Sequence, residues 1–347
     1  MTKTRIHPLS LIVEPDVPVE VEVRPSGEWV LRPRASVPIT DVYAGMTPET
    51  IRRDKPVPFT LEDQAAIIDP HISGLEPSSR YYFSVTLIDG SRYITAQRVL
   101  PLEGAVNFRD LGGYRTHDGK YTRWGRLFRS GMLAHLTDAD VRYLEALGLR
   151  LICDLRLPEE AAEHPDRPVT TAQGHSHPIV TETNKLRQMF TLLRYRRRLD
   201  QLMLKGYVST MIDKNARTFG AVYQHLADAD SLPAVFHCTA GKDRAGMTTA
   251  ILLLALGVPE DTIAADYSLS NHYYDSFADQ VASQMARLAK LGIDAEAFHP
   301  MLLADPNTIR GAIRYLLEKY GSVERYLHDQ AGVDEATLAR LRSNFLE

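Results

Sequence analysis

The chain has 347 residues, enough for about two domains, because single hydrophobic cores usually stop growing near 250–300 residues. Apolar residues make up 44% and charged residues 24% of the sequence, as in ordinary globular proteins. The formal net charge is −4 and the sequence pI is about 6.3. This balance argues against nucleic-acid binding, since nucleic-acid-binding proteins usually carry a basic excess.

Membrane insertion and secretion through a signal peptide are not predicted. The sequence has no run of 18 apolar residues, and Glu14, Pro15 and Asp16 interrupt the apolar stretch that an N-terminal signal would need. Two cysteines, Cys153 and Cys238, are too few for a disulfide framework, which favours a reducing compartment. We therefore expect a cytoplasmic protein, with secretion by a signal-independent route as the alternative.

Residues 1–100 are predicted to form a small all-β domain. Residues 17–24 alternate apolar and polar side chains with period two, and residues 25–27 (Pro-Ser-Gly) follow as a turn. The segment 75–83 resembles the tyrosine corner of fibronectin type III domains, in which a tyrosine near the start of the sixth strand bonds back to the preceding corner. That tyrosine would be Tyr81. We predict a fibronectin type III-like β-sandwich, with a β-rich cap of another topology as the alternative.

Residues 101–347 show a different pattern, in which apolar strands alternate with helices. Residues 138–147 have helical periodicity that Gly148 ends, and residues 149–155 are predicted to form a buried strand. Most of the chain from residue 259 onward is helical by periodicity. The pattern predicts an α/β domain with a central, mostly parallel sheet and many C-terminal helices.

The most informative segment is His237–Gly246, which reads His-Cys-Thr-Ala-Gly-Lys-Asp-Arg-Ala-Gly. It lies between an apolar run at 232–236 and another at 245–256, which predicts a strand, a loop and a helix. The loop amides and the positive end of the helix dipole would then converge on one anion site. The same field stabilises a thiolate on Cys238, and the guanidinium of Arg244, which follows after a spacer of five residues, fits two phosphoryl oxygens.

Phosphoryl transfer to a thiolate needs a nucleophile, donors for the phosphoryl oxygens, an acid for the leaving oxygen, and access for water. We assign Cys238 as the nucleophile and Arg244 as the phosphate clamp, and expect His237 to hold the loop in shape. The remaining predicted phosphate-binding residues of the loop are Thr239, Ala240, Gly241, Lys242, Ala245 and Gly246.

Three aspartates are candidates for the general acid. Asp154 ends the predicted strand at 149–155, and open parallel sheets bind ligands at the carboxyl ends of their strands. Asp243 lies inside the loop, and Asp110 lies in the segment Asn-Phe-Arg-Asp-Leu-Gly-Gly at 107–113. We favour Asp154, with Asp243 as the second choice.

From about residue 104 to its end, the chain resembles bacterial phosphatases of the protein tyrosine phosphatase B type, an atypical group with tyrosine, serine/threonine and phosphoinositide phosphatase activities. The matching segments are, in order, 107–113, 125–131, 154–156, 237–246, 265–267 with 270–271, and 320–322. The resemblance implies Cys238 as nucleophile, Arg244 as clamp and Asp154 as general acid, with Arg156 in a supporting role. It further implies that Lys242 and Asp243 form the family's loop signature and that no metal or other cofactor is needed.

The loop departs from this family at Ala245, because the family usually has threonine or serine directly after the loop arginine. That hydroxyl helps the cysteine to leave when the phosphocysteine is hydrolysed. We therefore expect slow turnover with an intermediate that can be trapped, unless Thr239 or Thr248 supplies the missing hydroxyl.

A basic amphipathic helix is predicted within residues 184–210, with Arg194, Arg196, Arg197 and Arg198 on its polar side. It is predicted to be a lid that attracts anionic lipid headgroups, and a packed helix with a solvated charged face is the alternative. His175 and His177 share one face of an extended segment, but without a third ligand nearby in the sequence they do not predict a zinc site.

Together these features predict a phosphomonoester hydrolase that acts on phosphotyrosine, and on phosphoserine or phosphothreonine as further substrates, through a phosphocysteine. The alternatives are a phosphoinositide phosphatase, for which Lys242 would contact an inositol phosphate, and a weakly active phosphate-binding module. The expected partners are a phosphorylated protein or lipid, and a protein recruited by the N-terminal domain.

Overall fold

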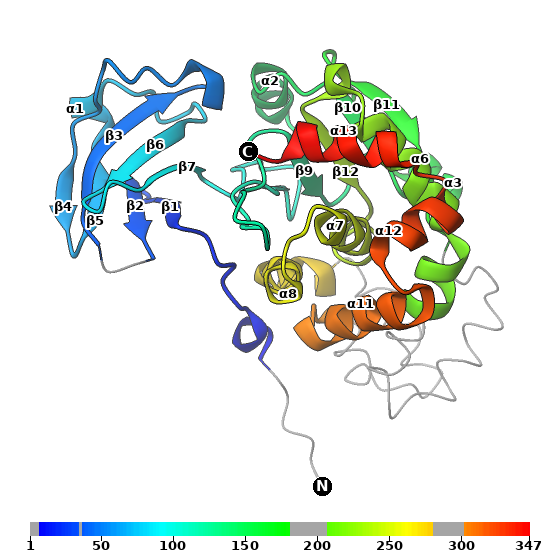
Figure 1. Cartoon of the computed structure of the whole chain (residues 1–347). Coiled ribbons are helices and arrows are strands. Elements are labelled where there is room, and N and C mark those ends of the chain that lie inside the picture. Colours follow the sequence, from blue (N-terminus) through cyan, green and yellow to red (C-terminus); the bar gives the residue numbers. More distant parts are fainter. Residues whose placement is uncertain (1–6, 35–36, 181–206, 280–301) are drawn as a thin grey trace, which may run out of the picture.

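The computed structural model describes residues 7–34, 37–180, 207–279 and 302–347, which form an N-terminal β domain and a larger C-terminal α/β domain (Figure 1). The predicted basic lid at 184–210 lies outside the described residues except for its last four positions, which begin the π-helix η3 (Tyr207–Ile212). Among the described residues, the helices are all too short or too polar to cross a membrane.

The N-terminal domain is a sandwich of two antiparallel sheets with strand orders β1-β2-β5-β4 and β3-β6-β7. Its strands are β1 (Val19–Val23), β2 (Trp29–Pro33), β3 (Ile39–Gly45), β4 (Thr60–Glu62), β5 (Ala65–Ile68), β6 (Tyr82–Leu87) and β7 (Arg92–Ala96). Short helices η1 (Pro8–Leu11), η2 (Pro48–Thr50) and α1 (Pro70–Ser73) lie before or between them. Buried side chains such as Trp29, Leu31 and Phe83 fill the space between the sheets.

The all-β prediction for this domain is confirmed. The hydroxyl of Tyr81, which directly precedes β6, accepts a hydrogen bond from the backbone amide of Glu76 at 3.1 Å, as a tyrosine corner does. The division into four and three strands is that of a constant-type immunoglobulin sandwich. The narrower assignment to the fibronectin type III type stays a prediction.

The C-terminal domain is built around a five-stranded sheet with the order β11-β10-β12-β9-β8. The strands are β8 (Arg109–Asp110), β9 (Leu127–Ser130), β10 (Leu151–Asp154), β11 (Gln173–Ser176) and β12 (Ala234–His237). Four of them run parallel, and only β8 at the edge is antiparallel. The sheet is therefore mostly parallel, as predicted, and the carboxyl ends of β10 and β12 lie side by side.

Helices cover both faces of this sheet (Figure 1). Alternate strand residues supply the two cores, with Cys153 in the core under α6 and α7 and Ile152 in the core under α2. The helices are α2 (Asp138–Ala146), α3 (Pro158–Glu163), α6 (Ala216–Leu226), η4 (Ala229–Ser231), α7 (Asp243–Ala255), α8 (Glu260–Ser268), η5 (Leu269–Tyr273), α11 (Pro306–Tyr320), α12 (Val323–Arg325), the π-helix η7 (Tyr326–Ala331) and α13 (Glu335–Phe345). Gly148, with φ +73°, follows α2 where the sequence predicts its end.

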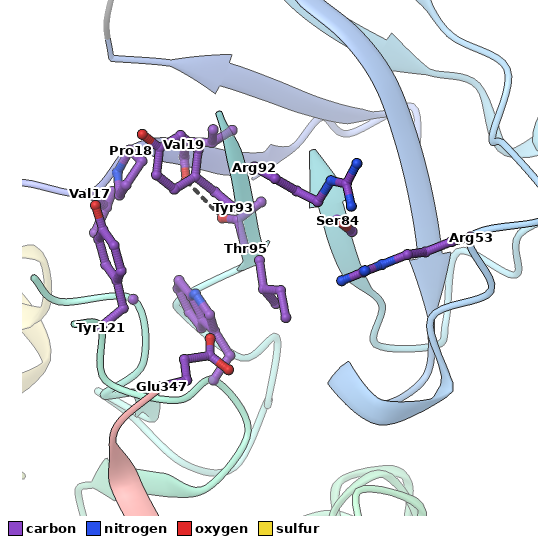
Figure 2. Close-up of a pocket in the computed structure, with 13 residues that line it drawn as sticks. Val17, Pro18, Val19, Arg53, Ser84, Arg92, Tyr93, Thr95, Tyr121 and Glu347 are labelled. Carbon is purple, nitrogen blue, oxygen red and sulfur yellow. Dashed lines mark hydrogen bonds between the residues drawn. The ribbon is translucent and has the colours of Figure 1, made fainter. Parts of the chain in front are cut away.

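A buried ion pair joins the two domains. Arg80, next to β6, donates to the carboxylate of Asp110 in β8 at 2.7 Å, and both side chains are almost fully buried. A second, exposed pair joins Glu49 to Arg126 at 2.8 Å. Between the domains lies a pocket of about 290 Å³, in which Tyr93 of β7 and the C-terminal Glu347 belong to opposite domains (Figure 2).

Candidate active site

The loop after β12 carries the residues that the sequence predicts as catalytic. Cys238 directly follows the strand and is 3% exposed, and α7 begins five residues later at Asp243. The loop turns at Gly241, which has a φ of +69°, and a Cβ atom there would lie 2.5 Å from the carbonyl carbon of Ser130. Only glycine fits this position without a shift of the neighbouring backbone.

Four consecutive carbonyl groups of the loop are held from one side by hydrogen bonds. These bonds run from Met132 N to Thr239 O (3.0 Å), from Asn107 Nδ2 to Ala240 O (3.0 Å), and from Arg129 Nη2 to Gly241 O (2.7 Å) and to Lys242 O (3.0 Å). In a trans peptide the N–H group points opposite to the carbonyl of the same unit. The amides of residues 240–243 therefore point toward the other side of the loop, as an anion-binding loop requires.

A buried charge network fixes the side chain of Arg129, which binds two of these carbonyls. The carboxylate of Asp266 in α8 accepts from Arg129 at 2.7 Å and from Arg109 at 2.9 Å, and Tyr114 donates to the same carboxylate at 2.8 Å. Burial, followed by repulsion from Arg109, lowers the pKa of Arg129 to about 10. Burial alone would raise the pKa of Asp266, but the two guanidinium groups outweigh it and hold that pKa well below its usual range. The network keeps all three groups charged at neutral pH.

Arg244 forms an ion pair with Glu160 of helix α3. Its Nη2 atom donates to Glu160 Oε1 at 2.8 Å and to Thr239 Oγ1 at 2.9 Å, its Nη1 atom donates to Glu160 Oε2, and the Thr239 hydroxyl donates to Glu160 at 2.8 Å. Burial raises the pKa of Glu160, but hydrogen bonds and the charge of Arg244 outweigh burial and lower that pKa to about 2. The Glu160 carboxylate thus accepts hydrogen bonds from Arg244 and Thr239, which are donors that would also suit a phosphoryl group.

Asp154, the favoured acid, lies at the end of β10 with both carboxylate oxygens occupied by Arg156. Arg156 donates through Nε at 2.9 Å to one oxygen and through Nη2 at 2.7 Å to the other. Burial raises the pKa of Asp154, but the hydrogen bonds and charge of Arg156 and the charge of His237 outweigh it, so the pKa is lowered. A lowered pKa opposes a role as proton donor at neutral pH.

His237, which the sequence predicts to hold the loop in shape, lies beside two carboxylates, and that role stays a prediction. It is fully buried, and its Nε2 atom lies 2.9 Å from a carboxylate oxygen of Asp166 and 3.8 Å from Asp154. Arg156 contacts Asp166 as well, at 2.9 Å. Three groups of this kind can also hold a metal ion. Here, however, the guanidinium of Arg156 already forms ion pairs with the carboxylates of Asp154 and Asp166. This favours a network of side chains over a metal site.

The signature residues Lys242 and Asp243 differ in exposure. Lys242 is 3% exposed, and its Nζ atom donates to the carbonyl of Leu303 at 3.4 Å, so its ammonium group is buried. The carboxylate of Asp243 is about one-third exposed, and the hydroxyl of Tyr267 donates to it at 3.2 Å. Among the three candidate acids, Asp243 is the most accessible to a substrate.

Asp110, the third candidate acid, belongs to the domain junction. Besides its pair with Arg80, its carboxylate accepts from the amides of Gly112 at 2.8 Å and Gly125 at 2.9 Å, and the residue has no exposed surface. These contacts give it a structural role. The segment that contains it supports the loop after β12 through two other members: Asn107 donates to the carbonyl of Ala240, and Arg109 binds Asp266.

The two hydroxyl groups that could replace the one missing at Ala245 already have partners. Thr248 donates to the carbonyl of Arg244 at 2.9 Å, and Thr239 donates to Glu160 at 2.8 Å. Ala245 itself is fully buried in the core of α7. The expectation of slow turnover therefore stays in place.

Sequence reasoning missed two acidic residues of this site, Glu160 and Asp166. Neither belongs to a matching segment, and Asp166 lies in a loop where no local pattern indicates its contacts. For Glu160 a signal existed, because Pro158 and two glutamates after a predicted strand mark the first turn of a helix. Its pairing with Arg244 comes from tertiary packing alone.

Comparisons with known proteins show the family of the chain. A model described as the tyrosine phosphatase family matches residues 100–347. A Cupriavidus necator chain named as a tyrosine-protein phosphatase is 33% identical over 251 residues, which cover 71% of this chain and 88% of that one. A tyrosine-protein phosphatase of Nostoc commune is 32% identical, covering 60% and 67%. The triple specificity protein phosphatase PtpB of Mycobacterium tuberculosis is 28% identical, covering 72% and 99%. The chain therefore belongs to the tyrosine phosphatase family.

Proposed function

We propose that this phosphatase hydrolyses phosphotyrosine in proteins through a phosphocysteine intermediate. The observation that carries the proposal is the loop of residues 238–244, in which the four carbonyls of residues 239–242 are held by hydrogen bonds while Cys238 and Arg244 lie at its two ends. Such a loop offers a row of amide donors, a fixed cation and a thiol in one place.

In the first step the Cys238 thiolate attacks phosphorus, and the bond between phosphorus and the phenolic oxygen breaks. The loop amides and Arg244 bind the nonbridging oxygens, whose charge they stabilise in the transition state. The leaving oxygen takes a proton from an acid. In the second step water attacks the phosphocysteine, the same residue accepts the proton of the water, and the thiolate leaves with inorganic phosphate as the product.

Asp243 is the acid that we propose, in place of the initially favoured Asp154. The carboxylate of Asp154 is bound on both oxygens by Arg156, and its pKa is lowered. Asp243 is more exposed and lies in the first turn of α7, where Lys242 is 3.6 Å from its carboxylate. Asp154 then acts with Arg156 and His237 to hold together the carboxyl ends of β10 and β12 beside the loop.

The leaving group distinguishes the two acids. Replacing a general acid costs on the order of 10²–10⁴ in rate, and the loss is largest when the leaving oxygen is strongly basic. We expect Asp243→Asn to lose much more activity on phosphotyrosine than on a nitrophenyl phosphate, whose leaving group needs little protonation. Asp154→Asn should lose the same factor on both substrates. The reverse pattern in steady-state rates would return the acid role to Asp154.

Slow hydrolysis of the phosphocysteine is the second expectation, because Ala245 lacks a hydroxyl. Stopped-flow measurement of phenol release should show a burst of about one equivalent, followed by a slower steady rate. Ala245→Ser should shrink the burst and raise the steady rate, with Ala240→Ser in the same loop as the control. A wild-type time course without a burst and with fast turnover would contradict this expectation.

The substrate class is tested with a panel of phosphotyrosine peptide, phosphoserine peptide and phosphoinositide vesicles, using Cys238→Ser as the inactive reference. Preference for the phosphotyrosine peptide supports the proposal. A strong preference for the lipid would instead favour the phosphoinositide alternative. Absence of turnover on every substrate, with phosphate still bound, would identify a binding module.

A further inference from the structure

Three histidines meet on the face of the sheet that helix α6 covers. His175 of the edge strand β11 and His177, which directly follows the strand, flank Ser176, so their side chains lie on the same face. His175 pairs in register with Cys153 of β10, whose side chain lies in the core beneath α6. His225 belongs to the last turn of α6 and reaches the same place from above.

The spacing of the three imidazole rings suits a shared ligand. The ring centroid of His225 lies 4.3 Å from that of His175 and 5.1 Å from that of His177. One ring nitrogen from each histidine can be chosen so that all three lie within 4.8 Å of one another. A tetrahedral zinc ion with nitrogens at about 2.1 Å needs its ligand atoms about 3.4 Å apart, so small rotations of the half-buried rings close the site.

The surroundings favour a neutral, metal-binding form of the rings. Among the described residues, His177 Nε2 is a buried nitrogen without a hydrogen-bond partner. Burial, together with the neighbouring histidines, lowers the pKa values of His177 and His225, while Asp228 alone acts in the opposite direction on His225. Neutral imidazole is the form that binds metals, and an unpaired buried nitrogen costs free energy until it is coordinated.

We propose that His175, His177 and His225 form a binding site for a divalent ion of the zinc class, separate from the phosphate loop. Three imidazoles suit zinc, copper or nickel better than magnesium or calcium, which prefer oxygen ligands. The three protein ligands leave a fourth position for water. The ion would join the edge strand β11 to α6, close to the candidate active site, since the amide of His177 donates to the carbonyl of Asp154 at 2.7 Å.

The test uses the full chain without a histidine tag and with Cys238→Ser, because the Cys238 thiolate can itself bind zinc. Equilibrium dialysis against micromolar zinc, followed by metal analysis, should give one equivalent per chain. Cobalt in place of zinc should give the visible absorption of a tetrahedral ion. Binding should weaken at least tenfold in His225→Ala and in His175→Ala, whose melting temperatures without metal report whether each variant is folded.

The matched control is the double variant His135→Ala/His164→Ala. It removes another pair of neighbouring histidines, with ring centroids 6.0 Å apart, and should keep the full equivalent of zinc. Zinc should raise the melting temperature of the parent and of this control by about 3 °C or more, and leave that of His225→Ala unchanged. No bound zinc in the parent would overturn the proposal. So would zinc that stays in His225→Ala but is lost in Asp166→Asn, since it would then lie in the cluster around His237.

Discussion

The carboxylate of Glu160 fixes the orientation of the Arg244 guanidinium. Both nitrogen atoms of the guanidinium fork and the hydroxyl of Thr239 are bound to it. An arginine that is free to rotate loses side-chain entropy when it binds phosphate, whereas one already held by a carboxylate is oriented beforehand. In the proposed role of Arg244 as phosphate clamp, Glu160 would orient the guanidinium before the substrate arrives.

Glu160→Gln should raise KM and lower kcat/KM by about tenfold, because an amide holds the guanidinium less firmly than a carboxylate does. Steady-state kinetics on an aryl phosphate check this, with Glu159→Gln, one residue away in the same helix turn, as the control. A fall in KM would show instead that the carboxylate competes with the phosphoryl group for Arg244.

The same variant should change the dependence of stability on pH. The pKa of Glu160 is lowered from 4.5 to about 2 in the folded protein, so its contribution to stability is present above pH 4.5. That contribution is lost as the pH falls from 4.5 toward 2. Melting temperatures measured across this window should fall less steeply for Glu160→Gln than for the parent, and parallel curves would contradict the assignment.

At the scale of elements, the loop of residues 238–244 depends on contacts from segments that are far away in the sequence. Asn107, Arg129 and Met132 hold its carbonyls, and Asp266 of α8 holds Arg129 in turn. The matching segments around these residues thus have a structural role, because they supply the hydrogen bonds that hold the loop carbonyls in place. The close approach of the Gly241 backbone to the Ser130 backbone belongs to the same set of contacts.

Gly241→Ala should destabilise the protein by about 2 kcal/mol or more and abolish phosphate binding, because it adds a collision with Ser130 to the strain of a positive φ. Gly119→Ala is the matched control, since Gly119 has a φ of +84° with open space around it, and should cost only about 1–2 kcal/mol. Urea unfolding and phosphate titration measure the two effects. Equal losses in both variants would mean that the contact with Ser130 does not matter.

At the scale of the whole molecule, the two domains are joined by a charge pair that is shielded from water. Arg80 reaches from the sandwich to Asp110, and its guanidinium also lies over the ring of Phe128 at 5.6 Å. Asp110 in turn holds two amides of the phosphatase domain. The N-terminal domain is therefore attached to the same segment that supports the phosphate loop.

Arg80→Met should lower the free energy of unfolding by about 3–5 kcal/mol, because it leaves the buried carboxylate of Asp110 without its cation. Arg126→Met removes the exposed partner of Glu49 at the same junction and should cost less than about 1 kcal/mol. Urea denaturation of both variants checks the difference. Similar costs would show that the buried pair stabilises the protein no more than the exposed pair does.

The sequence by itself determined the two domains, the mostly parallel sheet, the tyrosine corner at Tyr81 and the loop that carries Cys238 and Arg244. Local patterns suffice for these features, because periodicity, turns and helix starts depend on neighbouring residues. Only the tertiary structure decided which acids reach which cations: Glu160 meets Arg244, Arg156 occupies Asp154, Asp110 faces Arg80, and His225 joins His175 and His177. Such pairings depend on packing between distant segments, which no local pattern encodes.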